Sequence, residues 1–198
     1  MENEDAINVV TNGDYIFAIL SDGAGSGPLP KLAAQCTVDE VGKECLIASG
    51  EMFSSNDKLN KLIFNLQSRL NDVAIENDCK LSDMMATLII VGIDLKNKKY
   101  IIIHIGDGLV AKVEENEWKI VSYPENGYSK NATYFSNSLN VHSHLRIRHG
   151  TFESNEKFFL GTDGCFEGLY LSDDYVNTVE NKNITVGYDD VSYCYITT

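Results

Sequence analysis

The chain has 198 residues, a length that suits one domain with a sizeable hydrophobic core, and we expect residues 1–198 to fold as that single domain. Its composition is that of an ordinary globular protein, with 43% hydrophobic residues, but 29 acidic residues against 16 basic ones give a formal net charge of −13. Such acidity argues against a nucleic-acid backbone or an anionic membrane surface as the main partner.

The first half of the chain predicts one buried strand and two helices. Tyr15 to Leu20 is a continuous apolar run between turn residues, which indicates a strand buried on both faces. A helix is expected from about Pro30, since proline is tolerated in a first turn, to Ala48. An apolar stripe from Leu59 to Val73 predicts the second helix, with three candidate caps: Ser55, Asn56 and Asp57.

The second half has the shorter period of β-strands. Met85–Ile93 and Lys99–Ile105 are joined by a hairpin-length connection. Further strands are expected at Leu109–Val113, Trp118–Tyr123, Leu145–Ile147, Lys157–Leu160 and Val191–Ile196. The polar stretch from Pro124 to about Asn140 is a candidate functional loop, and Cys165–Glu180 is a candidate helix. Runs of helices and then hairpins, without strict alternation, favour an α+β fold with mainly antiparallel sheets.

Cysteine usage and hydropathy indicate the compartment. The five cysteines contain no C-x-x-C pair, so we expect free thiols in a reducing compartment and neither a disulfide framework nor a zinc site. The longest apolar run, Thr87 to Ile93, is too short to span a bilayer. The opening residues do not resemble a signal peptide. We therefore expect a cytoplasmic protein.

The glycine-rich stretch after the first strand, Asp22-Gly-Ala-Gly-Ser-Gly-Pro28, does not fit the common phosphate-binding loops. A dinucleotide fingerprint needs glycine or alanine where this chain has Pro28, and Asp22 would set a negative charge beside the pyrophosphate. A Walker loop needs a lysine that is absent here. What remains is a turn that follows an acidic strand end.

That acidic turn recurs along the chain. It appears in Asn3-Glu4-Asp5, Asp22-Gly23, Gly106-Asp107-Gly108, Thr162-Asp163-Gly164 and Gly187-Tyr188-Asp189-Asp190. One Asp-Gly pair is usually only a turn, but several at strand ends predict that carboxylates from distant segments converge. Converging carboxylates need a cation or raised pKa values, and hard divalent ions such as Mg²⁺ and Mn²⁺ prefer an all-oxygen set.

In this order, these motifs resemble the metal-dependent protein phosphatases of the 2C family (PPM superfamily). Ala86-Thr87-Leu88 resembles the family's hairpin motif before Gly106-Asp107, and Asp189-Asp190-Val191-Ser192 resembles its terminal motif. The form Gly-Asp-Gly, with the Tyr128–Thr133 segment downstream, resembles the bacterial subgroup. The resemblance covers nearly the whole chain and implies a four-layer α-β-β-α sandwich, in which two antiparallel sheets are flanked by helix pairs.

The resemblance also implies a site and a reaction. Asp22 would bridge two Mg²⁺ or Mn²⁺ ions, with Asp163 and Asp189 completing the ligands of one. The Gly23 carbonyl would contact the other ion, which Glu4 or Asp5 would bind directly or through water. Water between the ions would attack phosphoserine or phosphothreonine directly, reversing a Ser/Thr kinase on a protein substrate. Asp107 is expected to shape the turn or support the ligands from outside.

Two departures from the family pattern concern the phosphate. No arginine precedes Asn3 in this sequence, and Ala24 stands where animal members have a histidine. The substrate-binding charge would then come from Lys130, Arg146 or Arg148, which lie in the long loop and the strand after it. The alternative function is a catalytically weak module of the same fold that binds metal or a phosphoprotein partner.

Overall fold

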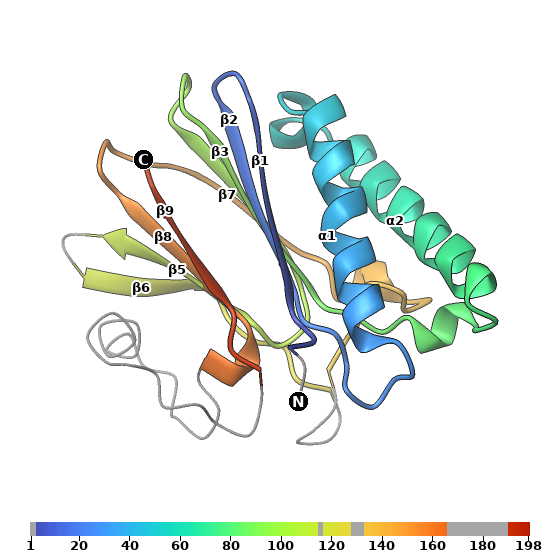
Figure 1. The fold of residues 1–198 in the computed structure, drawn as a ribbon. Helices are drawn as coiled ribbons and strands as arrows, with labels where there is room; N and C mark the ends of the chain where they lie inside the picture. The colour runs from blue at the N-terminus through green and yellow to red at the C-terminus, as the bar shows by residue number, and fades with distance from the viewer. Residues whose placement is uncertain (1–2, 115–116, 128–132, 166–189) are drawn as a thin grey trace.

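The computed structural model describes residues 3–114, 117–127, 133–165 and 190–198, and in this part of the chain two antiparallel sheets face each other (Figure 1). One sheet has five strands in the order β1-β2-β3-β4-β7, and the other has four in the order β6-β5-β8-β9. The strands are β1 (Ala6–Asn12), β2 (Tyr15–Ser21), β3 (Leu88–Asp94), β4 (Lys99–Ile105), β5 (Leu109–Glu114), β6 (Glu117–Ser122), β7 (Arg146–Thr151), β8 (Lys157–Gly161) and β9 (Tyr193–Thr197).

Two long helices cover the outer face of the five-stranded sheet (Figure 1). They are α1 (Pro30–Ile47) and α2 (Asn56–Glu76), close to the predicted ranges. The Ser55 hydroxyl caps α2 by accepting a hydrogen bond from the Lys58 N–H, which satisfies one of the backbone donors exposed at a helix start. The apolar stripe of α2 packs with α1 on the sheet and forms the larger hydrophobic core.

A second core lies between the two sheets. Because side chains alternate along a strand, Ile90 and Ile103 face the helices while Val91 and Ile102 face the other sheet. From the four-stranded sheet, Phe158 and Leu160 complete this layer. The central strands are therefore buried on both faces, as the apolar run of β2 predicted.

The predicted α+β sandwich of two antiparallel sheets is confirmed, and the described residues form three of its layers: helices, sheet and sheet. The candidate helix at Cys165–Glu180 falls, apart from Cys165 itself, outside the described residues. The five cysteines are all free thiols, as expected. Within the described part of the chain, no helix is long and apolar enough to cross a membrane.

Strand β1 was not predicted as a strand, because asparagines alternate with apolar residues on its inward face. Asn8 and Asn12 point toward α1, where their side-chain amides donate to the carbonyls of Val38 and Leu46. The apolar Ile7 and Val9 on the opposite face are 43% and 52% exposed. The hydrogen bonds that satisfy the inward amides come from a helix distant in sequence, so local periodicity could not reveal them.

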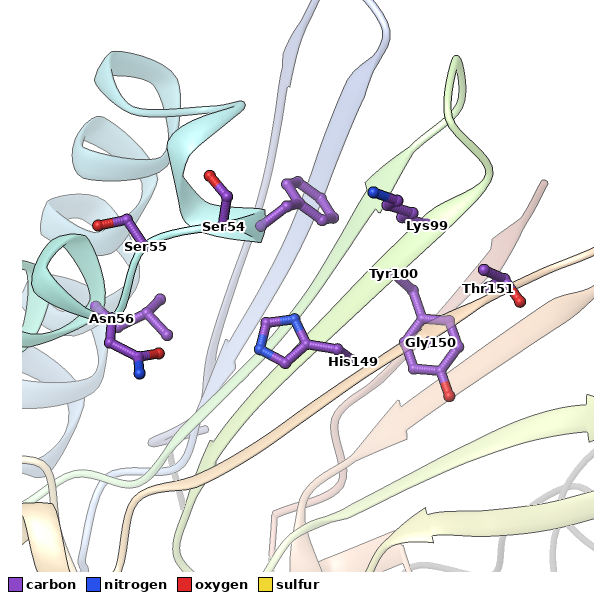
Figure 2. Close-up of a pocket in the computed structure, with 10 residues that line it drawn as sticks. Ser54, Ser55, Asn56, Lys99, Tyr100, His149, Gly150 and Thr151 are labelled. Carbon is purple, nitrogen blue, oxygen red and sulfur yellow. The ribbon is translucent and has the colours of Figure 1, made fainter.

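A hollow of about 400 Å³ lies between the loop before α2 and the edge of the five-stranded sheet (Figure 2). Ser54, Ser55 and Asn56 line one side, and Lys99 and His149 lie on the other. These sheet residues belong to the end of the sandwich where β4 begins. The strand rises about 3.4 Å per residue, so this hollow is roughly 20 Å from the acidic turn that follows β4. None of its lining residues, all described, is acidic.

Candidate metal centre

Three acidic turns meet at one end of the sandwich. Asp22 follows β2, Asp107 comes two residues after β4, and Asp163 comes two residues after β8. Each contributes a carboxylate oxygen to a group whose atoms all lie within 4.8 Å of one another. The structure therefore brings together Asp22 and Asp163, as predicted. It adds Asp107, which was expected to lie outside the direct ligands.

Asp22 is held in place by the loop before β3. Its backbone N–H donates to the Thr87 hydroxyl at 2.9 Å, and the Thr87 N–H donates to the Asp22 carbonyl at 2.8 Å. Gly106, just before Asp107, has φ +110° and a side chain there would meet Thr87 at 2.6 Å, so only glycine fits. Thr87 thus ties the turn after β2 to the turn after β4.

A second threonine joins the N-terminal segment to the turn after β8. The Thr162 hydroxyl donates to the Asp5 carboxylate at 3.0 Å and accepts from the Ser192 N–H at 3.1 Å. The Thr162 N–H also donates to the Ser192 carbonyl. The residue before Asp163 is therefore fixed by segments from both ends of the chain. Threonine in the Thr-Asp-Gly motif suits this role, because its hydroxyl can donate one hydrogen bond and accept another.

Burial and mutual repulsion both act on the acids of this cluster. Burial raises the pKa of Asp22 to about 10, and the negative charges of Asp5 and Asp163 are the next causes. Burial also raises the pKa of Asp5, although hydrogen bonds from neighbouring side chains oppose the shift. A carboxylate in such a place is either protonated or paired with a bound cation.

The residues fit one or more divalent cations. The donor set consists of carboxylates, which Mg²⁺ and Mn²⁺ prefer. One oxygen of Asp5, Oδ1, is buried and has no hydrogen-bond partner among the described residues. The backbone of Gly23 passes so close that a side chain there would lie 2.2 Å from the Pro30 carbonyl oxygen and 2.9 Å from that of Glu4. The acids and the carbonyl oxygens packed around Gly23 together form an oxygen-rich cradle suited to a hard cation.

Asp189 and Glu4 are the predicted carboxylate ligands that remain. Asp189 lies outside the described residues. Its neighbour Asp190 accepts a hydrogen bond from the Glu4 N–H at 2.5 Å, which places Asp190 beside the N-terminal segment. The Glu4 carboxylate is not in the three-acid group, and one of its oxygens lies 2.9 Å from the position of a Cβ on Gly25.

The predicted phosphate-binding cations are placed differently from one another. Lys130 lies outside the described residues, and Arg148 is exposed on β7, donating to the carbonyl of its neighbour Ile147. Arg146 is half-buried, and its guanidinium donates to the carbonyls of Gly106 and Tyr123. It is thus bound to the backbone that precedes Asp107.

Glu125 completes the packing around Arg146. Its carboxylate lies 3.5 Å from the Arg146 Nε and 2.9 Å from the His144 Nδ1, and the Glu125 N–H donates to the Gly106 carbonyl. The His144 ring stacks on Tyr134 with 3.4 Å between ring centroids. Sequence alone did not reveal this support for the Gly106 turn, since its members are brought together only by the paired strands.

An acid cluster at the strand ends of a two-sheet sandwich is typical of metal-dependent protein phosphatases. The family model described as protein phosphatase 2C matches residues 1–185. The chain therefore belongs to the protein phosphatase 2C family, whose members depend on metal ions. No curated protein matches the chain significantly.

Solved structures of bacterial phosphatases share the fold. The S. agalactiae serine/threonine phosphatase superposes with a TM-score of 0.68 at 19% identity, covering 93% of this chain and 82% of that one. A structure described as a bacterial serine phosphatase gives 0.69 at 14% identity, covering 100% and 92%. RsbX in complex with magnesium gives 0.65 at 16% identity, covering 100% and 88%. At these identities the likeness concerns the fold alone.

Proposed function

We propose that this chain hydrolyses phosphoserine or phosphothreonine in a protein substrate of a Ser/Thr kinase, by direct attack of water at phosphorus. The single observation that carries this is the group formed by Asp22, Asp107 and Asp163 at the meeting point of three strand ends. Family membership supports the reaction class. We further propose a cytoplasmic location, in keeping with the five free thiols.

The protein's own groups would hold two Mg²⁺ or Mn²⁺ ions and orient the phosphate. The proposed ligands are the carboxylates of Asp22, Asp163, Asp189, Glu4 and Asp5 and the carbonyl of Gly23, with Asp107 as an added candidate. When bound, the ions lower the pKa of water and stabilise negative charge on the phosphate oxygens. The rigid turns on which Asp22 and Asp163 lie keep the carboxylates in position without reorganisation.

Phosphate release from phosphoserine and phosphothreonine peptides tests the proposal. We expect activity with Mn²⁺ or Mg²⁺ and none with EDTA. Asp163→Asn should lower the activity at least roughly 100-fold, because loss of a direct metal ligand should cost more than loss of a residue that only supports a ligand, which costs up to about 100-fold. Asp72→Asn, an exposed change on α2, is the matched control and should keep full activity. Activity that survives EDTA, or that Asp163→Asn retains, would exclude this function.

A second candidate is a module that binds metal or a phosphoprotein but turns over slowly. The observation that favours it is that the Arg146 guanidinium donates to two backbone carbonyls, which leaves it less able to bind the phosphate. Calorimetry with Mn²⁺ and with a phosphopeptide separates the two. Tight binding of both without phosphate release would favour the module.

A further inference from the structure

A cleft of about 580 Å³ opens beside the acid cluster, a volume within the usual range for ligand pockets. Its walls are mostly carbon: Pro28, Leu29, Pro30 and Leu32 supply apolar surface. The polar side chains that line it are Glu4, Lys31 and Gln35. One acid and one base give the cleft no strong net charge of its own, so its chemistry favours an apolar group.

The cleft and the metal centre share one loop. Asp22 begins the loop, and Pro28 to Pro30 end it at the start of α1. At Gly23 the loop passes against both the Pro30 and the Glu4 carbonyls, and Glu4 itself lines the cleft. A ligand that placed a phosphate at the acids would therefore reach the cleft with its adjoining part.

The cleft is also formed in advance. Prolines fix the backbone φ on either side of Leu29, and the Ala33 N–H donates to the Leu29 carbonyl at 3.0 Å as the first turn of α1. Leu29 and Leu32 pack against the core between helices and sheet. A pre-organised apolar wall loses little freedom on binding, so contact with it adds to affinity and specificity.

We propose that this cleft binds an apolar side chain next to the phosphorylated residue of the substrate, so that the protein prefers phosphopeptides with leucine or a similar residue at that position. The inference rests on the proposed function. Because Gly23, next to Asp22, lies against the carbonyls of Pro30 and Glu4 at the cleft, and an extended peptide advances about 3.3–3.6 Å per residue, we expect this side chain within about three residues of the phosphoserine. A charged side chain in the same place would gain less, because the prolines and leucines that form most of the walls cannot replace its hydration.

The test uses phosphoserine peptides that carry leucine, alanine or aspartate at each of three positions on either side. Each rate is divided by the rate for p-nitrophenyl phosphate, which has no flanking residues. We expect one position at which kcat/KM for leucine exceeds that for alanine and aspartate roughly tenfold or more. Gln35→Trp, which fills the cleft from the exposed side of α1, should abolish the preference, whereas Lys43→Trp, two turns further along α1, should keep it.

Fluorescence anisotropy of the same labelled peptides gives a second readout that does not need turnover, and the leucine preference should appear there as well. Equal rates and equal affinities at every position, in a protein that hydrolyses p-nitrophenyl phosphate, would overturn the cleft assignment alone. Absence of metal-dependent hydrolysis would overturn the proposed catalysis. The peptide affinities would then decide whether the cleft binds an apolar side chain. Dissociation of an oligomer of the natural protein by Gln35→Trp would assign the cleft to contact between copies and overturn the proposal.

Discussion

Replacing Asp22 by asparagine should stabilise the metal-free protein while destroying the effect of metal. In the absence of a cation, burial and the charges of Asp5 and Asp163 raise the pKa of Asp22 to about 10, so its carboxyl must keep a proton that the unfolded chain has lost. Asparagine has nearly the same shape and never carries that charge. The usual expectation for a polar substitution at a half-buried site is the opposite, a loss of stability.

The magnitude follows from the size of the shift. At pH 7 the ordinary value of 3.8 lies about 3 units below the solution pH, and each unit corresponds to about 1.4 kcal/mol. Holding the proton therefore costs at most about 4 kcal/mol, and neighbouring acids share part of it, so we expect a gain of about 2–4 kcal/mol. For a chain of this size, each kcal/mol raises Tm by about 2–4 °C.

The direction of the pKa shift also determines how stability depends on pH. A folded-state pKa above the unfolded one contributes stability at low pH that is lost as pH rises, here from about 4 toward about 10. Thermal unfolding in EDTA across this range should show a steeper loss for the natural protein than for Asp22→Asn. Saturating Mn²⁺ should then raise Tm of the natural protein and leave the variant unchanged, with Asp72→Asn behaving as the natural protein. A lower Tm for Asp22→Asn in EDTA at pH 7 would refute this reasoning.

Four further substitutions test the residues around the acid cluster. Asp107→Asn should weaken Mn²⁺ binding by calorimetry roughly tenfold or more; unchanged affinity would return Asp107 to a role in the turn alone. Arg146→Ala should cost about 1–3 kcal/mol of unfolding free energy, since the part-buried Gly106 carbonyl loses one of its two donors and Glu125 loses a nearby positive charge, while Arg148→Ala should stay within about 0.5 kcal/mol. Equal losses would contradict this contrast. Gly23→Ala should cost about 1–3 kcal/mol, because a methyl group would overlap the Pro30 carbonyl; a Tm equal to that of the natural protein would show that the loop yields freely.

The acidic strand ends could be predicted from the sequence because each is visible in a few consecutive residues. A run such as Tyr15 to Leu20 ending on Asp22 shows both its burial and its final carboxylate in consecutive residues. The convergence of Asp22 with Asp163 was predictable from the recurrence of the same turn. Asp107 carried the same signal, and the structure places it with the others.

What the sequence could not show depends on tertiary partners. The inward asparagines of β1 find carbonyls on α1, and Arg146 finds the Gly106 carbonyl across the β4–β7 pairing. Nothing in the residues around Arg146 distinguishes a guanidinium that binds a phosphate from one that binds a turn. The same holds for the cleft, whose walls include Glu4 and the start of α1, some two dozen residues apart in the chain.

A crystal soaked in Mn²⁺ and measured at the manganese absorption edge shows whether Asp22 and Asp163 hold a cation. We expect anomalous density at the oxygens of Asp22 and Asp163, within ordinary Mn–carboxylate distances of both, and its disappearance in Asp22→Asn. Fully occupied manganese elsewhere on the protein, with these carboxylates left without an ion, would mean that the acid cluster is not a metal centre.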